Sequence, residues 1–212
     1  MALARGLLVP LACARGIVMD MSVLEGHEIE PERIRPLRRV EYERLVELGV
    51  FDDERVELLR GALVAMSPTD PSHDESVNQL ARRLIASLGD RASVRVQSSF
   101  AASDDSEPLP DIVVAPAGAY WTEHPSRALL VVEVARSSLR KDRGVKAQLY
   151  GSVAVQEYWI VDVSRGAVEV LRAPAGDGTW GSRRVATRGE TLTLEAFPDV
   201  VVEVAAIVPP LA

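Results

Sequence analysis

The sequence has very little cysteine. Cys13 is the only one in 212 residues, so no disulfide can form within the chain. A domain of this length can bury a core of normal size without disulfides or a structural metal. A single thiol is also what the reducing cytoplasm allows, and the cytoplasm is the location we expect.

Long apolar runs are missing as well. No stretch approaches the roughly 20 apolar residues needed to cross a bilayer, so no membrane association is expected. The first 35 residues carry a short apolar run and an Ala-x-Ala pattern that ends at Ala14, which resemble a signal peptide. Pro10 interrupts that run, and Met19 and Met21 offer later start sites. We predict an unstructured extension over residues 1–35, with export as the alternative, and one domain over residues 36–212.

Positive charge is scarce overall. The chain has 24 Lys and Arg against 31 Asp and Glu, a formal net charge of −7. Proteins that bind nucleic acid without sequence preference are usually basic, so this balance disfavours that class. The segment RSSLRKDRGVK, at 136–146, nevertheless gathers basic residues around the single acid Asp142. A local phosphate contact therefore remains open, since metal ions can supply further positive charge.

Apolar periodicity predicts an α/β domain whose sheet is flanked by helices. Helical spacing is present over residues 40–49, 71–88 and 139–150. Two short strands are expected within 55–67, around the Arg60-Gly61 turn, and the strand expected at 167–171 pairs with the one before it. The C-terminal strands should extend the same sheet. The other expected strands span 94–97, 111–115, 129–134, 157–163, 184–187, 191–194 and 200–204.

Three acidic residues occupy positions that ordinary packing does not explain. Asp111 opens an apolar strand, Glu133 interrupts a run of valines, and Glu57 lies inside an apolar hairpin. Buried carboxylates are costly unless they are paired, hydrogen-bonded or bound to metal. If the strands are neighbours, Asp111 and Glu133 project onto one spot, where a divalent cation could activate water and neutralise phosphate charge. Lys146, on the following helix, could stabilise the developing charge.

Each of these residues also has an ordinary structural explanation. A single glutamate in a strand more often faces water, and an aspartate after proline often simply begins a strand. Lys146 and Asp142 stand four residues apart, the spacing of a solvated ion pair on a helix. The residues alone leave both interpretations open.

Four segments in this order and spacing resemble the Uma-two family of restriction endonucleases, within the PD-(D/E)XK nuclease superfamily. The resemblance covers roughly residues 37–204 and implies a restriction-endonuclease-like fold, a central mixed sheet flanked by helices. It also implies Mg²⁺ as cofactor, with Mn²⁺ as a substitute. The segments are VELLRGALVAMSPTDPSH (56–73), LPDIVV (109–114), VVEVARSSLRKDRGVKAQLY (131–150) and QEYWIVD (156–162).

The resemblance assigns roles to individual residues. It implies that Asp111 and Glu133 are primary metal ligands and that Glu57 is a supplementary one. The superfamily lysine stands two positions after the glutamate, but Ala135 occupies that position here. In the family's own pattern, a lysine followed by a tyrosine lies on the next helix, which implies that Lys146 takes the role of the superfamily lysine. Asp111, Glu133 and Lys146 are then the catalytic residues.

Substrate contacts are expected from the basic stretch and from a glutamine that recurs in the family. These side chains would hold backbone phosphates and would not read the base sequence. The family has a small or acidic residue where Arg136 stands, so Arg136 could bind phosphate or pair with Glu133 and block the metal. The expected contact residues are Gln97, Arg136, Arg140, Lys141 and Arg143.

One histidine and four aromatic residues also have expected roles. His73 matches a recurring histidine at the start of the long helix, where a capping or structural role is favoured. Tyr158 and Trp159 lie in an apolar strand and are expected in the core. Tyr120 and Trp121 follow the Asp111 strand and are better candidates for touching substrate.

The sequence thus predicts a Mg²⁺-dependent endonuclease that hydrolyses phosphodiester bonds in nucleic acid, with DNA the expected form. It leaves the oligomeric state open, with a homodimer as one candidate assembly. The alternative is a non-catalytic nuclease-fold module that binds nucleic acid or a protein partner. The acidic net charge favours the alternative, whereas an intact Asp111–Glu133 pair favours the enzyme.

Overall fold

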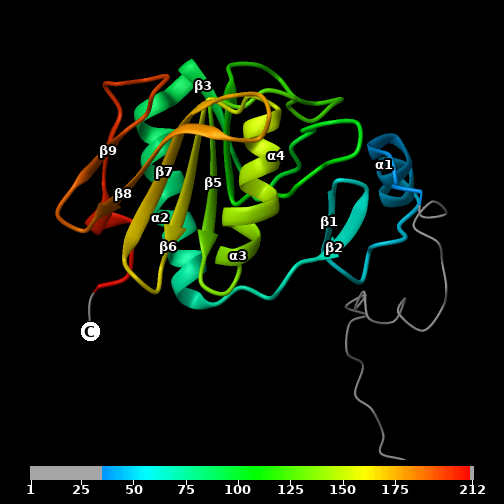
Figure 1. Ribbon diagram of the computed structural model, residues 1–212, viewed down its shortest axis with the longest axis horizontal. Helices are drawn as coiled ribbons and strands as arrows, with labels where there is room; N and C mark the ends of the chain where they lie inside the picture. Colours follow the sequence, from blue (N-terminus) through cyan, green and yellow to red (C-terminus); the bar gives the residue numbers. More distant parts are fainter. Residues whose placement is uncertain (1–34, 211–212) are drawn as a thin grey trace, which may run out of the picture. The chain divides into compact units, whose positions relative to one another are not determined.

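The computed structural model describes residues 35–210, shown in colour in Figure 1. Pro36–Ala212 form one compact unit. The extension predicted over residues 1–35 lies outside the described residues, apart from its last position. Within the described part of the chain, no helix is long and apolar enough to span a membrane.

A six-stranded sheet, in the order β3-β4-β5-β6-β7-β8, is the centre of this unit. Neighbouring strands are antiparallel except β5 and β6, so the mixed sheet predicted from the sequence is confirmed. Parallel neighbours need a long crossover connection, which helical residues 139–152 provide. The strands are β3 (Ala92–Val96), β4 (Ile112–Pro116), β5 (Leu130–Ala135), β6 (Glu157–Asp162), β7 (Ala167–Pro174) and β8 (Trp180–Thr187).

Helices cover both faces of the sheet (Figure 1). Side chains alternate along a strand, so Val132 and Val134 of β5 pack with helix α2, whereas Val131 and Ala135 pack on the side of helix α4. Glu133 therefore points to the α4 face. The helices are α1 (Arg39–Glu47), α2 (Pro71–Leu88), α3 (Leu139–Lys141) and α4 (Ala147–Ser152), with single 3₁₀ turns at Gly89–Arg91 and Val204–Ala206.

Helix α2 has the bounds that the sequence predicts, because both of its ends are set by local signals. The Asp70 carboxylate accepts the backbone N–H groups of Ser72 and His73, which would otherwise lack partners. Pro71 occupies the first turn, where a missing N–H costs nothing. Gly89 ends the helix with a positive φ of 51°.

The crossover helix differs from the regular helix predicted over residues 139–150. A π-helical turn, η4 (Asp142–Lys146), separates α3 from α4. The carbonyl of Asp142 accepts the N–H of Ala147, five residues later, and also the hydroxyl of Tyr158 from β6 at 3.1 Å. A side chain that bonds into the helical ladder in this way is a recognised cause of such a distortion. Sequence spacing could not reveal it, because the hydroxyl comes from a different element.

The C-terminal strands are only partly as predicted. β8 extends the main sheet, but β9 (Thr191–Thr193) and β10 (Val201–Glu203) pair only with each other in a separate two-stranded sheet. The predicted N-terminal hairpin is present as β1 (Val56–Leu59) and β2 (Ala62–Ala65). Two backbone hydrogen bonds, between Leu58 and Glu107, join this hairpin to the loop before β4.

Candidate active site

The ends of β4 and β5 bring two of the predicted acids together. The antiparallel register pairs Ile112 with Val132, so Asp111 comes opposite Glu133. The Asp111 carboxylate also accepts the backbone N–H of Val134 at 2.8 Å, which fixes it against β5. Both side chains are buried, at 8% and 5% exposure. The two acids are therefore neighbours, as the sequence predicts.

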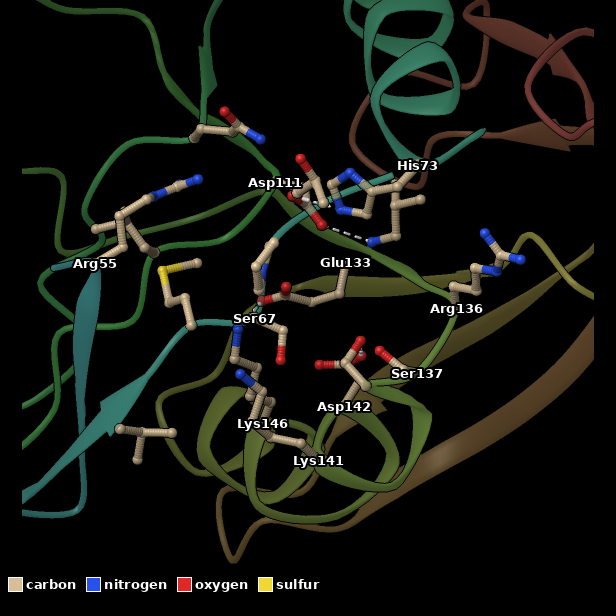
Figure 2. Close-up of a pocket in the computed structure, with 18 of the residues that line it drawn as sticks. Arg55, Ser67, His73, Asp111, Glu133, Arg136, Ser137, Lys141, Asp142 and Lys146 are labelled. Carbon is tan, nitrogen blue, oxygen red and sulfur yellow. Dashed lines mark hydrogen bonds and ion pairs between the residues drawn. The ribbon is translucent and has the colours of Figure 1, made fainter. Parts of the chain in front are cut away.

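A pocket of about 280 Å³ opens at this edge (Figure 2). Most of the residues predicted to form the site contribute to its wall, but Glu57, Arg140 and Arg143 do not. Arg140 instead borders an adjacent depression, together with Lys141. The predicted residues in the pocket wall are Gln97, Asp111, Glu133, Arg136, Lys141 and Lys146.

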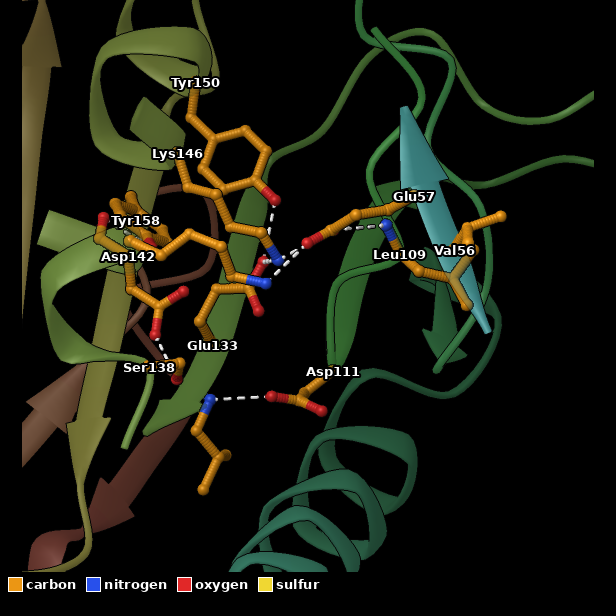
Figure 3. Close-up of polar contacts among 12 residues, drawn as sticks. Val56, Glu57, Leu109, Asp111, Glu133, Ser138, Asp142, Lys146, Tyr150 and Tyr158 are labelled. Carbon is orange, nitrogen blue, oxygen red and sulfur yellow. Dashed lines mark hydrogen bonds and ion pairs between the residues drawn. The ribbon is translucent and has the colours of Figure 1, made fainter. Parts of the chain in front are cut away.

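Lys146 reaches the acids from the crossover helix, as the sequence predicts. Its Nζ lies 2.8 Å from Glu133 Oε1 and 3.0 Å from Glu57 Oε2, and the residue is 2% exposed (Figure 3). The solvated pair with Asp142 is not formed, because the Asp142 carboxylate accepts the Ser138 hydroxyl at 2.6 Å. The extra residue in the π-helical turn changes the helical phase between these two side chains.

Glu57 binds two lysines. Lys141 Nζ donates to Glu57 Oε1 at 2.6 Å, while Lys146 lies on the other oxygen. These are the only two lysines among the 24 Lys and Arg residues of the sequence. The N–H of Leu109 also donates to Glu57, at 3.3 Å. The Glu57 carboxylate is thus paired with two ammonium groups, and its predicted role as a supplementary metal ligand stays a prediction.

Tyr150 is a site residue that the sequence-based list omits. Its hydroxyl donates to Glu133 Oε1 at 2.7 Å, and its ring is fully buried against Tyr158. The only sequence signal for it is the family pattern in which a tyrosine follows the lysine. Tyr150 and Lys146 stand four residues apart and lie on the same side of the helix, and both hold Glu133.

The charges in the site perturb one another. Burial raises the pKa of Glu133 to about 8, against the attraction of Lys146. Burial would lower the pKa of Lys146, but the charges of Glu133 and Glu57 outweigh it and raise that pKa. The reverse holds at Glu57, where burial is outweighed by Lys146 and Lys141 and the pKa falls. Burial also raises the pKa of Asp142. The buried acids and lysines of this site therefore lie close enough to shift one another's pKa.

The donor chemistry fits a hard divalent cation. Mg²⁺ prefers oxygen ligands and commonly keeps several waters while one or two carboxylates hold it. Asp111 and Glu133 supply two adjacent carboxylates, one from each of two neighbouring strands. Among residues 35–210, no group of three His, Cys, Asp or Glu side chains is arranged to hold a metal. The fit is therefore to a cation held by two carboxylates and water.

His73 contacts the site directly. Its backbone N–H belongs to the N-terminal cap of α2, in line with the structural role expected from the sequence. In addition, His73 Nε2 lies 3.2 Å from Asp111 Oδ1, and Nδ1 lies 3.2 Å from Asp74 Oδ1. The hydrogen bond to Asp111, with a second from Asp74, raises the pKa of His73 to about 9. This contact links residues 38 positions apart, which the pattern of the sequence could not anticipate.

The basic stretch divides between two surroundings. Arg136 pairs with Asp70 at 3.2 Å, so it does not form the blocking pair with Glu133 considered above. Arg143 Nε donates to Glu169 Oε1 of β7 at 2.6 Å, away from the pocket. Arg140 is exposed. Among the basic residues of this stretch, only Arg136, Lys141 and Lys146 reach the pocket wall.

The aromatic residues divide as the sequence predicts. Tyr158 and Trp159 are fully buried in β6, which confirms their place in the core. Trp121 is 93% exposed in the loop after β4. Contact of Trp121 or Tyr120 with substrate stays a prediction.

The mixed sheet and the acid–lysine pocket at one of its edges define a nuclease-like protein. The family model described as Uma-two, putative restriction endonuclease, matches residues 39–206, and the chain belongs to this family. The crystal structure of a putative nuclease belonging to DUF820 from Anabaena variabilis is similar in fold, with a TM-score of 0.65. It is 13% identical, and the match covers 81% of this chain and 97% of that one. No curated protein matches the chain.

Proposed function

We propose that this chain is a Mg²⁺-dependent endonuclease that hydrolyses phosphodiester bonds, with Asp111, Glu133 and Lys146 as catalytic residues. The observation that carries the proposal is the buried Lys146 ammonium, 2.8 Å from Glu133 in a pocket that Asp111 also lines. Replacing such a buried ion pair by apolar residues is often neutral or stabilising, so stability alone gives little reason for it. Perturbed ionisable groups in a cleft are typical of sites that perform chemistry.

Asp111 and Glu133 would hold the metal. When bound, Mg²⁺, or Mn²⁺ in its place, supplies positive charge for phosphate oxygens and makes water acidic enough to react near neutral pH. We assign Glu57 a positioning role, because its carboxylate already binds both lysines. By holding Lys146 between two carboxylates, Glu57 and Glu133 keep its Nζ protonated at the inner wall of the pocket.

Lys146 would orient the attacking water and stabilise the charge that develops on the phosphate. An arginine would be a poor replacement, because its planar fork needs more room than a compact ammonium. The chain uses arginine for nearly all its other basic positions, so both lysines in one site point to a specific requirement. This argument supports a catalytic use of the pocket over a purely structural one.

Phosphates on either side of the cleaved bond would contact the basic side chains along the rim. Arg136, Lys141 and Gln97 line the pocket, and Arg140 borders the depression beside it. Such contacts hold the backbone without reading the base sequence, and DNA is the expected substrate. A homodimer would bring two sites to the two strands of a duplex, and sedimentation of the protein with and without duplex DNA tests that assembly.

Cleavage of supercoiled plasmid, single-stranded DNA and RNA tests the proposal, in Mg²⁺, in Mn²⁺ and in chelator. Asp111→Ala and Lys146→Ala should each lower metal-dependent cleavage by at least about 10²-fold. Asp90→Ala, which changes an exposed aspartate in the turn after α2, is the matched control and should cut like the parent.

Two outcomes would contradict the proposal. Cleavage that survives Asp111→Ala would mean that another site or a contaminant cuts. A folded protein that binds nucleic acid and never cuts, with either metal, would support the non-catalytic module.

A further inference from the structure

A second and larger pocket lies beside the candidate active site. Its volume is about 820 Å³, and its wall includes residues of α1, the start of β1 and the loop at residues 120–124. Arg55 and Leu109 line both pockets. None of the residues proposed for catalysis or metal binding lines the second pocket, so it needs an explanation of its own.

Its wall carries an excess of negative charge, from five glutamates against two arginines. Arg39 already pairs with Glu43 at 2.5 Å. Within residues 35–210, neither Glu54 nor Glu123 has an ion-pair partner within 4 Å. Phosphate groups would be repelled from such a wall, whereas a cation would be attracted. The five glutamates are Glu43, Glu47, Glu54, Glu107 and Glu123.

Glu107 is the buried member of this set, at 3% exposure. Its Oε2 atom has no hydrogen-bond partner among the described residues. Its nearest basic neighbour is His124, whose Nε2 lies 3.8 Å from Glu107 Oε1. Burial lowers the pKa of His124, so this imidazole does not supply a full counter-charge. Burial raises the pKa of Glu107, and the nearby Glu43 adds to it, against a hydrogen bond from Ser99 and the charge of Arg39.

The same pocket offers flat aromatic surfaces. Trp121 is 93% exposed on its wall. Tyr42 and Phe51 are stacked, with ring centroids 5.8 Å apart, and also line it. Aromatic faces attract cations, and tryptophan does so most strongly. A solvent-exposed tryptophan that lines the same pocket as a buried carboxylate oxygen without a hydrogen-bond partner is a combination that surface packing alone does not require.

We propose that this pocket binds a guanidinium group, with Glu107 as the acceptor and Trp121 as the stacking surface. A guanidinium is planar, always charged and able to donate two parallel N–H bonds to one carboxylate. It also stacks on aromatic rings, which a hydrated metal ion does not. The volume is far larger than one metal ion needs and admits the aliphatic stem of an arginine. This inference is independent of the proposed nuclease activity.

Calorimetry and tryptophan fluorescence on the full chain, in chelator, test the proposal. The probe is N-acetyl-arginine amide, compared with agmatine, with the citrulline analogue and with the lysine analogue. Citrulline keeps the planar shape without the charge, and lysine keeps the charge without the plane. The arginine probe should bind at least about tenfold more tightly than either analogue. Equal binding of agmatine would identify a small guanidinium compound as sufficient, whereas preference for the blocked amino acid would identify a peptide side chain.

Variants locate the binding. Glu107→Gln should weaken it about tenfold or more, since one partner of a buried charge pair is lost. Its fold should survive, because the change removes a carboxylate whose Oε2 has no partner among the described residues. Glu47→Gln is the matched control, because Glu47 lines the same pocket but already pairs with Arg44. Trp121→Ala should weaken binding, while Trp121→Phe should recover much of it.

The proposal fails if the citrulline analogue binds as well as the arginine probe. It also fails if Glu107→Gln changes the affinity for the arginine probe by less than about twofold. A change of that size is what the loss of an exposed ion pair produces. Binding of nucleosides in preference to the arginine probe would overturn it in favour of a nucleobase pocket. Plasmid cleavage by the same preparations is scored separately, so loss of nuclease activity does not decide this question.

Discussion

The two faces of the central sheet are built from different kinds of residue. Apart from Trp159 and the Glu157–Arg172 ion pair, the α2 face is aliphatic, with Leu80 and Leu84 fully buried against the valines of β4 and β5. The α4 face buries Glu133, Lys146 and the tyrosine hydroxyls among its apolar side chains. Buried charges contribute little to stability, whereas aliphatic burial contributes strongly. One face therefore holds the fold together, which allows the other to carry the charges that chemistry needs.

The largest effect should follow from Glu133→Gln, on the α4 face. We expect metal-dependent cleavage to fall about 10³-fold, because a ligand and the partner of Lys146 are both changed. Stability should fall as well, since the change leaves the buried Lys146 ammonium paired with Glu57 alone, so cleavage is scored per folded molecule. Plasmid nicking rates, together with Mn²⁺ binding by calorimetry, provide the measurement. Full activity in this variant would break the functional assignment of the α4 face.

The opposite pattern is expected from Leu80→Ala, on the α2 face. Leu80 is fully buried, so its truncation should lower the free energy of unfolding by about 2–5 kcal/mol. Guanidinium titration with circular dichroism measures this change. Cleavage per folded molecule, assayed well below the melting transition, should match the parent. A large loss of cleavage in the folded variant would mean that the two faces are coupled.

A smaller effect is expected from Tyr150→Phe, which removes one of the two donors to Glu133 Oε1. Cleavage should fall about tenfold, because one hydrogen bond to a charged group contributes about 1.5–3 kcal/mol. Tyr42→Phe is the matched control. Tyr42 is also buried, but its hydroxyl donates to the Val56 carbonyl, away from Glu133. Equal losses in both variants would assign the effect to the general loss of a buried hydroxyl and not to Glu133.

The smallest expected effect is on DNA binding, and it distinguishes Arg136 from Arg143 in the basic stretch. Arg136→Gln should weaken binding of a DNA duplex about threefold to tenfold and reduce the salt dependence by about one charge. Arg143→Gln should have a smaller effect, because Arg143 pairs with Glu169 outside the pocket. Fluorescence anisotropy in chelator at several salt concentrations measures both. Equal losses would show that Arg143 leaves Glu169 for the substrate, as the sequence-based assignment requires.

Local signals in the sequence predicted much of the fold. Asp70, Pro71 and Gly89 define the ends of α2, and the alternation of valines around Glu133 identifies β5 and the direction of its side chains. The neighbourhood of Asp111 and Glu133 also followed, because adjacent strands must align their ends. These features depend on residues close together in the chain or on simple strand geometry.

Contacts between elements far apart in the chain could not be predicted from the sequence. Glu57 meets Lys141 across 84 positions, so the expected metal ligand also pairs with two lysines. His73 meets Asp111, and β9 pairs with β10 in place of the main sheet. Nothing in the local pattern distinguishes these pairings from alternatives of similar burial. The pocket proposed to bind a guanidinium group could not be predicted for the same reason, since its wall is formed by separate parts of the chain.

The π-helical turn at Asp142–Lys146 makes this helix sensitive to length. The turn adds the equivalent of one residue to the helix. The side chains after it are therefore rotated about the helix axis relative to those before it. Deleting a single residue such as Gly144, whose Cα faces open space, would convert the turn to ordinary α-helix. Either Lys146 or the residues before the turn would then rotate by about 100° around the axis. Single-residue deletions in this helix, which leave both of its flanking strands intact, would therefore disconnect the lysine from the acids.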